Sequence, residues 1–335
     1  MKYRTLGRTG AEVSELMFGC GNVGGIMIHA DYEVMRDAVK RALEVGINWF
    51  DTAAQYGRGV SEENLGKILK ELDAKPYLSS KVRIDPESSE DIDSQVERAI
   101  HESLERLQVD HIDLFQLHNG IDGQTTKRSL DTNSILGRLG VITALEKLRD
   151  QRLIKWIGMT ALGDTGLCRR LVESGRIDTA QVYFNLINPS AGLTVPKFSL
   201  DHVNRKTTSG QDFTGIIEEC RATNTGVIVI RALAAGVLAT DVRHGRESAV
   251  AEDTELAEEE RKAKAVFELL GDQFGNRAQT AIRYALSQAG VSTVDFAIGE
   301  LDHLEQGLAA IENDPLPPET LDDIYGLYKH DFKYL

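Results

Sequence analysis

The sequence predicts a (β/α)8 TIM barrel with an N-terminal β-hairpin and long βα loops at its C-terminal face. Eight short apolar runs alternate with amphipathic helical patterns, and this order implies parallel strands because each helix must cross back over the sheet. The 335 residues suit one barrel, so we expect a single barrel domain over residues 1–335. An open doubly wound sheet is the alternative, but the first strand is followed only by a loose glycine cluster.

The strands are expected at the apolar runs, after a hairpin at residues 3–13. Each run is short and is followed by polar or turn-forming residues, as is typical of buried strands in parallel sheets. In chain order the expected strands are Leu16–Cys20, Ile47–Phe50, Tyr77–Ser80, Ile112–Leu117, Leu153–Met159, Thr179–Phe184, Gly226–Ile230 and Ser292–Ile298.

The helices are expected where apolar residues recur every three or four positions. The first helix places Val34, Ala38, Ala42 and Val45 on one face, and the second begins at Ser61, whose hydroxyl can cap it. The later helices are expected around Ile92–Leu107, Val141–Leu148, Asp164–Ser174, Phe213–Ala222, Glu255–Leu270, Arg277–Gln288 and Asp302–Glu312.

The composition excludes several classes of protein. The net charge of −14 disfavours a nucleic-acid partner, which requires a basic face. No apolar stretch has the length of a signal peptide or of a membrane helix, so we expect no membrane partner. The three cysteines are widely spaced and lack a C-x-x-C pattern, which indicates no metal site and reduced thiols in a cytoplasmic protein. The oligomeric state is left open.

Four side chains with proton-transfer chemistry are expected at one end of the barrel. Asp51, Lys81 and His118 directly follow the second, third and fourth strands, and Tyr56 lies in the loop after Asp51. The C-terminal ends of barrel strands converge on one mouth, and neighbouring strands are only about 5 Å apart. Each residue alone has a structural explanation, but their convergence favours a shared site.

The chemistry of these groups suits the reduction of a carbonyl. A nearby ammonium such as that of Lys81 lowers the pKa of a phenol, and Asp51 would keep that ammonium protonated. His118 could then donate a hydrogen bond that orients a carbonyl oxygen, while Tyr56 protonates it during hydride attack.

These segments resemble the aldo-keto reductases. The stretch INWFDTAAQYGRGVSEENLGKIL is similar to the signature of that family, YLSSKV to its lysine strand and IDLFQLHN to its histidine strand. The resemblance extends from about residue 3 to residue 313 and implies a catalytic tetrad of Asp51, Tyr56, Lys81 and His118, with Tyr56 as general acid or base.

The resemblance also implies a cofactor, NADP(H) or NAD(H), in an extended form across the barrel mouth. Gly21 lies in the opening segment that resembles the family, and Gln181 matches the glutamine that contacts the nicotinamide carboxamide. Thr160 stands where the family has a serine and keeps its hydroxyl, whereas Ala161 replaces the usual asparagine and removes one carboxamide contact.

Two further segments are expected to bind the cofactor. Arg231 stands where relatives contact the pyrophosphate and could pair with it, or else with a carboxylate at the barrel rim. The neighbouring loop resembles the family's pyrophosphate loop and adds Leu233, Gly236 and Leu238.

The last cofactor segment favours NAD(H), or dual use, over NADP(H). It offers Gly299 and Glu300 where relatives specific for NADPH usually have a basic residue, and a carboxylate can accept from a ribose hydroxyl but repels a phosphate. Arg277 and Arg283, in the preceding helix, could supply a basic contact instead.

Substrate recognition is expected from the long loops Asn119–Leu139 and Asn185–Asp212, from Trp49 and from the aromatic C-terminal tail. The resemblance leaves the substrate open among aldehydes, sugars, steroids and quinones, all of which relatives handle. Polar loop residues such as Asn119, Asp122 and Arg205 favour a sugar-like one.

Two other functions compete with an NAD(P)-dependent aldo-keto reductase, such as an alcohol or aldose dehydrogenase. A barrel aldolase would use Lys81 as a Schiff-base nucleophile, which requires a neutral amine. A regulatory module resembling the potassium-channel β-subunits would bind cofactor without turnover. Reduction of a carbon–carbon double bond is associated in the family with loss of the histidine, and His118 is present.

Overall fold

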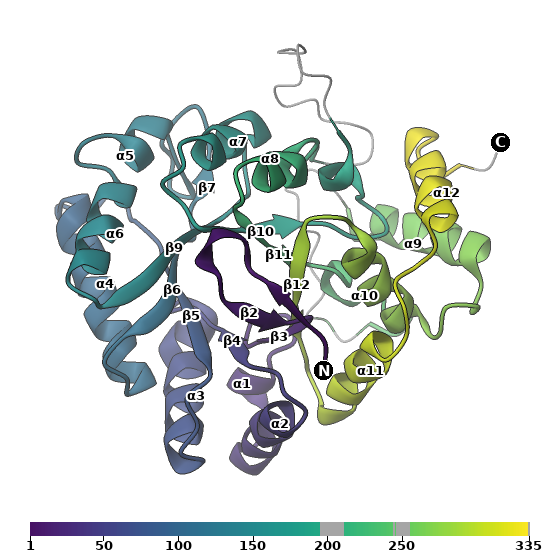
Figure 1. The fold of residues 1–335 in the computed structure, drawn as a ribbon, viewed down its shortest axis with the longest axis horizontal. Coiled ribbons are helices and arrows are strands. Elements are labelled where there is room, and N and C mark those ends of the chain that lie inside the picture. Colours follow the sequence, from purple (N-terminus) through teal and green to yellow (C-terminus); the bar gives the residue numbers. More distant parts are fainter. Residues whose placement is uncertain (195–210, 244, 246–254, 334–335) are drawn as a thin grey trace.

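Eight parallel strands close into a barrel in the order in which they occur along the chain, which confirms the predicted fold class. The structure is a computed structural model that describes residues 1–194, 211–243, 245 and 255–333 (Figure 1). The barrel strands are β3 Leu16–Gly19, β4 Trp49–Asp51, β5 Tyr77–Val82, β6 Ile112–Leu117, β9 Ile154–Thr160, β10 Thr179–Tyr183, β11 Gly226–Ile230 and β12 Val291–Ala297.

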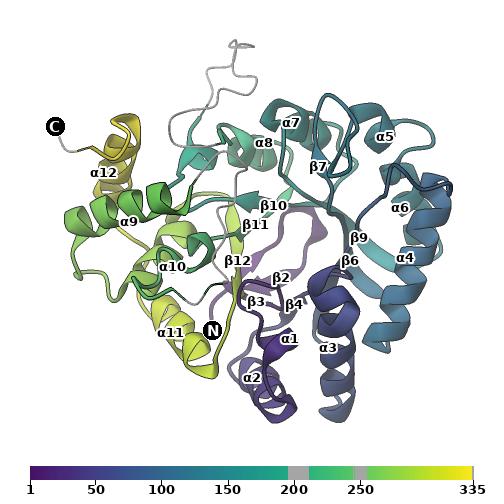
Figure 2. The ribbon, with the colours of Figure 1, turned by 180° about the vertical axis from the view of Figure 1, so that it is seen from behind.

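Helices surround the barrel and cover the outer faces of its strands (Figures 1 and 2). Their apolar stripes face inward; in the helix over residues 32–44, for example, Met35, Ala38 and Val39 are buried. The covering helices are α2 Tyr32–Glu44, α3 Val60–Glu71, α4 Ile92–Leu107, α6 Val141–Asp150, α7 Thr165–Glu173, α8 Ile216–Ala222, α10 Arg277–Ser287 and α11 Leu301–Ile311.

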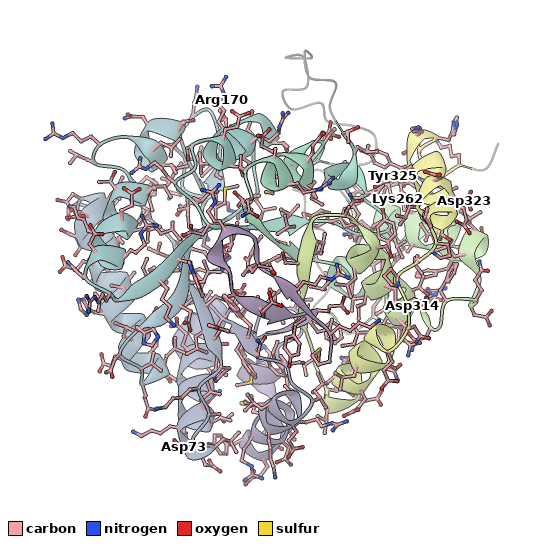
Figure 3. The ribbon with its side chains drawn as sticks, viewed as in Figure 1. Asp73, Arg170, Lys262, Asp314, Asp323 and Tyr325 are labelled. Atoms are coloured by element: carbon pink, nitrogen blue, oxygen red, sulfur yellow. The ribbon has the colours of Figure 1, made fainter. Side chains whose placement is uncertain are left out.

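Helices α9 (Leu256–Leu270) and α12 (Pro318–Lys329) pack against each other to one side of the barrel (Figure 1). The aromatic tail belongs to this pair: Phe332 is buried beneath the Lys262 ammonium, and the Tyr325 hydroxyl donates to Gln288 Oε1 at 3.0 Å. Figure 3 shows Tyr325 and Lys262 away from the barrel centre. Tyr334, which we also expected to help in recognition, lies outside the described residues.

The predicted hairpin is present as β1 (Tyr3–Thr5) and β2 (Glu12–Ser14), and it covers the N-terminal end of the barrel (Figure 1). Its apolar residues pack on the layer of barrel side chains nearest the N-terminal ends of the strands. The hairpin contributes Leu6, Ala11 and Val13 to this buried cluster, and the barrel strands contribute Met17, Trp49, Leu114 and Ile228. This packing closes one end of the barrel, so the functional groups must lie at the other.

The expectation that Trp49 helps to recognise substrate is wrong. Its side chain is fully buried under the hairpin and stacks on both Tyr77 and Trp156, with ring centroids 4.9 and 5.8 Å away. Trp49 precedes Asp51 by two residues on one strand, so it points into the barrel one layer closer to the N-terminal end. Trp49 therefore packs inside the barrel, on the N-terminal side of Asp51.

Two local expectations are also corrected. Helix α3 begins at Val60, and Ser61 does not cap it because its hydroxyl donates to the Cys20 carbonyl at 3.0 Å and bonds Thr52 at 2.9 Å. The loop Asn119–Leu139 is partly regular. It contains the short strands β7 (Gly120–Ile121) and β8 (Ser129–Leu130) and the helix α5 (Thr132–Leu136).

Five short elements complete the described chain. Helix α1 precedes α2, and the 3-10 turns lie in the hairpin, after β4, after β10 and after β11. Their bounds are α1 Ile26–His29, η1 Gly7–Thr9, η2 Tyr56–Gly59, η3 Ser190–Gly192 and η4 Ala234–Gly236. Of the helices that the structure describes, none combines the length and the apolar character that crossing a bilayer demands.

Candidate active site

The ends of β4 and β5 bring Asp51 and Lys81 together inside the open end of the barrel. Asp51 pairs in register with Ser79, two residues before Lys81, so both side chains point inward from neighbouring strands. The Lys81 ammonium forms a buried ion pair with Asp51 Oδ2 and donates to the Thr52 carbonyl at 2.9 Å. These contacts fix the direction of the ammonium.

The third donor position of Lys81 is directed at Tyr56. Lys81 Nζ lies 3.3 Å from the Tyr56 hydroxyl oxygen, which accepts this hydrogen bond, and 4.8 Å from the ring centroid. Tyr56 begins the 3-10 turn η2, whose left-handed residues Gly57 and Gly59 bend the chain so that the ring returns over the barrel mouth. Because the phenol accepts from Lys81, its own proton remains available to another acceptor.

The environment of the pair sets its protonation. Burial alone would lower the pKa of the Lys81 ammonium, but the charge of Asp51, with contributions from Tyr56 and Asp295, raises it above its usual value. Lys81 therefore stays charged, which disfavours its use as a Schiff-base nucleophile. Burial raises the pKa of Tyr56, and the lowering by Lys81 offsets only part of that effect. The predicted lowering of the phenol pKa by the ammonium is present, but desolvation outweighs it and the net direction is upward.

His118 lies on the other side of Tyr56, just after β6. The two rings are 6.0 Å apart and nearly perpendicular, at 87°. His118 Nδ1 lies 3.0 Å from Gln55 Oε1 in the loop that also carries Tyr56. Burial, and then the charges of Lys81 and Arg83, lower the pKa of His118 to about 3, so the ring is neutral at neutral pH. The structure thus brings all four predicted residues together.

Several supporting residues escaped the sequence analysis. Ser79 and Gln116 donate to Asp51 Oδ1 at 2.6 and 3.2 Å, and the Trp49 indole donates to Ser79 at 3.2 Å. Asp295 on β12 also faces this group. The sequence did indicate them: Ser79, Gln116 and Asp295 are polar residues at inward positions of apolar strands, where a polar side chain requires a hydrogen-bond partner.

Two of the predicted cofactor residues form a polar pair inside the barrel. Thr160 Oγ1 donates to Gln181 Oε1 at 3.3 Å, and Gln181 Nε2 is buried without a hydrogen-bond partner among the described residues. A buried amide donor without an acceptor is costly, and a carboxamide oxygen would satisfy it. Gly21 lies against Tyr56, with room for a Cβ atom 3.7 Å from the phenol ring. These positions suit a nicotinamide ring beside Tyr56.

The loop after β11 carries backbone strain at three non-glycine residues. Arg231, Ala234 and Ala235 have positive φ angles of 59°, 45° and 56°. Such conformations cost free energy and concentrate at ligand-binding sites, which agrees with the expected pyrophosphate loop. The amides of Gly236 and Leu238 both donate to the Leu233 carbonyl, so the loop is held by its own backbone bonds.

The segment after β12 leads into helix α11. Glu300 is exposed at the N-terminus of this helix, and the Gly299 amide donates to His303 Nδ1 at 3.2 Å. The two basic residues that could have served a phosphate here have other partners. Arg277 forms an ion pair with Asp241, and Arg283 donates to the carbonyls of Asp314 and Phe274, each at 2.8 Å.

The loop residues predicted to recognise substrate lie in different settings. Asn119 is buried and exchanges two hydrogen bonds with the backbone of Ile84, so its amide organises the loop. Asp122 is exposed, and Arg205 lies outside the described residues. No cluster of three or more His, Cys, Asp or Glu side chains within the described part of the chain could hold a metal ion.

The barrel is closed at one end and holds a phenol, an ammonium, a carboxylate and a neutral imidazole at the other, a set of groups that can transfer a proton to or from a small polar group. The model of the aldo/keto reductase family matches residues 15–329. The chain belongs to this family of oxidoreductases, whose members use nicotinamide cofactors and act on small carbonyl or sugar substrates.

Individual relatives agree with this membership. The chain is 26% identical to L-galactose dehydrogenase of Arabidopsis thaliana over 330 residues, which are 97% of this chain and 93% of the relative. It is 28% identical to D-threo-aldose 1-dehydrogenase of a Pseudomonas species over 56% of this chain and 62% of the relative. An aldo-keto reductase of Bacillus halodurans in its holo form has the same fold, with a TM-score of 0.72 at 24% identity, covering 98% of this chain and 96% of that one.

Proposed function

We propose that this protein is an NAD(P)-dependent oxidoreductase that interconverts a carbonyl and an alcohol, with Tyr56 as the general acid in reduction and the general base in oxidation. The hydrogen bond of 3.3 Å from the Lys81 ammonium to the Tyr56 oxygen carries this proposal. It leaves the phenolic proton free for a substrate oxygen, and it places a fixed positive charge where a phenolate forms.

Each member of the group has one task. The cofactor, when bound, supplies or accepts the hydride. Tyr56 gives its proton to the carbonyl oxygen, and Lys81 stabilises the phenolate that remains. Asp51 holds Lys81 charged and directed. Neutral His118 would orient the same oxygen through an Nε2–H donor, which requires the Gln55 amide to present its N–H to His118 Nδ1. In oxidation the proton moves in the opposite direction, from the alcohol to the phenolate.

The cofactor preference that the residues support is NAD(H), or use of both cofactors. Exposed Glu300 would repel a 2′-phosphate but can accept from a ribose hydroxyl, and Arg277 and Arg283 are engaged elsewhere. Gln181 and Thr160 would hold the carboxamide, and Arg231 with its loop, at residues 233–238, would meet the pyrophosphate. A strong preference for NADPH in kcat/KM would contradict this assignment.

The substrate class that we propose is a small sugar or hydroxyaldehyde. The relatives that support it are named for dehydrogenation of L-galactose and of D-threo-aldoses. The decisive experiment is a panel of aldoses, aldehydes and ketones, assayed with both cofactors in both directions. Turnover of a sugar supports the proposal, whereas tight cofactor binding without turnover of any carbonyl or alcohol would favour a regulatory module.

The pH dependence should show the raised pKa of Tyr56 and the lowered pKa of His118. Reduction requires the protonated phenol, so its kcat/KM should stay level across neutral pH and fall only in the alkaline range. Oxidation requires the phenolate and should rise with pH. Because the pKa of His118 is about 3, neither profile should contain a step near pH 6.5. A full profile in both directions checks this, and a histidine-like step would contradict it.

Removal of His118 should damage substrate orientation and leave cofactor binding intact. We expect His118→Ala to lower kcat/KM for the carbonyl by about 10²-fold, the usual cost of one lost contact to the reacting oxygen. Cofactor affinity, measured by fluorescence titration, should be unchanged, because His118 contacts Gln55 and Tyr56 rather than the expected cofactor residues. If the substitution lowered cofactor affinity as much as kcat/KM, His118 would instead belong to the cofactor site.

A further inference from the structure

Asp295 is a second carboxyl group beside the site, on a strand two positions away from β4 in the barrel. It lies on β12, which pairs with β3, and β3 pairs in turn with β4. Between Asp295 and Asp51 stands Gly19, the last residue of β3, paired with Ala297 on one side and Asp51 on the other. A Cβ atom on Gly19 would overlap the Asp295 carboxyl oxygen, so the two carboxyl groups can approach each other only across a glycine.

The titratable groups that face Asp295 are Asp51 on β4, Lys81 on β5, Tyr56 after β4 and Cys20 after β3. Neighbouring β11 has the apolar sequence GVIVI and contributes no charge. Lys81 is therefore the single cation among these groups. With both carboxyls ionised the group would carry a net negative charge beside Tyr56, whereas one shared proton makes it neutral.

The hydrogen-bond partners of the two carboxyls differ, and this difference favours Asp295 as the carboxyl that holds the proton. Asp51 accepts from Lys81, Ser79 and Gln116, so its charge is well stabilised. Asp295 Oδ1 is inaccessible to solvent and has no hydrogen-bond partner among the described residues, while the other contact of this carboxyl is with Asp51 itself. A carboxylate without donors is unfavourable in such a place, but a carboxylic acid can donate to Asp51.

We propose that Asp295 is a positioning residue that stays a neutral carboxylic acid at working pH and donates a hydrogen bond to Asp51, so that the group of Asp51, Lys81 and Asp295 is neutral overall and Lys81 stays directed at Tyr56. Burial, the charge of Asp51 and hydrogen bonding to it raise the pKa of Asp295 well above its usual range, in agreement with this assignment. The role rests on the proposed function, because it acts on Tyr56 through Asp51 and Lys81.

The neutral state of Asp295 also matters for the chemistry of Tyr56. An ionised Asp295 would raise the pKa of the phenol further and oppose the effect of Lys81. With the proton held between the two carboxyls, the positive charge of Lys81 acts on Tyr56 without that opposition. Asp295 touches neither the hydride nor the substrate in this account.

The first test does not depend on activity. Infrared difference spectra at neutral pH between the wild-type protein and Asp295→Asn should contain the carbonyl stretch of a protonated carboxylic acid, which is distinct from carboxylate bands. Absence of that band from the wild type would overturn the proposal even if the enzyme turns over as expected. Presence of the band in a protein without carbonyl turnover would leave Asp295 neutral and refute only the proposed function.

The second test separates positioning from a merely structural role. Asp295→Leu removes the donor to Asp51 and should lower kcat by roughly tenfold or more, with KM less affected, while Asp295→Asn keeps an N–H donor and should restore most of kcat. The alkaline fall of the reduction profile should lie at the same pH in Asp295→Asn and wild type. If this alkaline fall lay at lower pH in Asp295→Asn than in the wild type, Asp295 would be ionised in the wild type. Equal kcat in the Asp295→Asn and Asp295→Leu variants would exclude a positioning role.

Discussion

Tyr56→Phe is expected to lose carbonyl reduction by a factor of about 10²–10⁴, the usual contribution of a general acid, while it keeps its cofactor affinity. The substitution removes one oxygen atom and leaves the ring against Gly21 and His118. The Lys81 ammonium loses its acceptor at 3.3 Å but keeps Asp51 and the Thr52 carbonyl, so the fold should persist. Steady-state kinetics and a cofactor titration on the same preparation measure both properties.

The chain offers a matched control for this variant. Tyr32 also lies beneath a lysine, Lys67, at 4.1 Å from ring centroid to ammonium, but this pair is on the outside of the barrel, with Tyr32 half-buried on α2 and Lys67 exposed on α3. Tyr32→Phe removes the same atom from a tyrosine outside the barrel mouth and should retain wild-type kcat. Wild-type kcat in Tyr56→Phe would refute the assigned proton donor.

Lys81→Met should reduce both activity and stability. Without the ammonium the pKa of Tyr56 rises further, which makes the phenol a weaker acid, and we expect kcat to fall by about 10²-fold or more. Asp51 is left as a buried carboxylate without its counter-ion, at a cost of about 3–5 kcal/mol in the free energy of unfolding. Denaturant titration and steady-state kinetics measure the two effects.

A double variant distinguishes the two effects of Lys81. Asp51→Asn together with Lys81→Met removes both charges, so most of the lost stability should return while activity stays low. Lys67→Met is the control for a lysine over a tyrosine on the surface and should change neither property. Recovery of activity in the double variant would show that Lys81 serves only to neutralise Asp51.

The fold could be predicted because its signals are local and repeated. Each apolar run of the barrel strands lies between polar or turn residues, and each helix has an apolar face, so the eight units can be read independently. The elements that were missed, such as α5 and the β7–β8 pair, lie in a loop whose short pieces are held by tertiary contacts. Ser61 was misassigned because its hydroxyl bonds Thr52 in the preceding loop and the carbonyl of Cys20, which is 41 residues away in the sequence.

The four central site residues could be predicted because they stand at or just after strand ends, whose convergence is a property of the barrel. Trp49 was misplaced because strand alternation decides the layer that a side chain occupies, and the hairpin that covers it is far away in sequence. The net direction of the Tyr56 pKa depends on burial, which no spacing reveals. The pairing of Asp295 with Asp51 depends on the close approach of three strands at Gly19.

The most direct test of the account is a crystal structure of the protein with oxidised cofactor and an unreactive carboxylate analogue of a small hydroxyaldehyde. The account predicts that one analogue oxygen lies about 2.6–3.2 Å from both the Tyr56 hydroxyl and the His118 ring. The carbon that bears this oxygen should lie about 3–3.5 Å from the nicotinamide ring. An analogue oxygen bound by other side chains, with the nicotinamide ring away from Tyr56, would contradict the assignment of Tyr56 as proton donor.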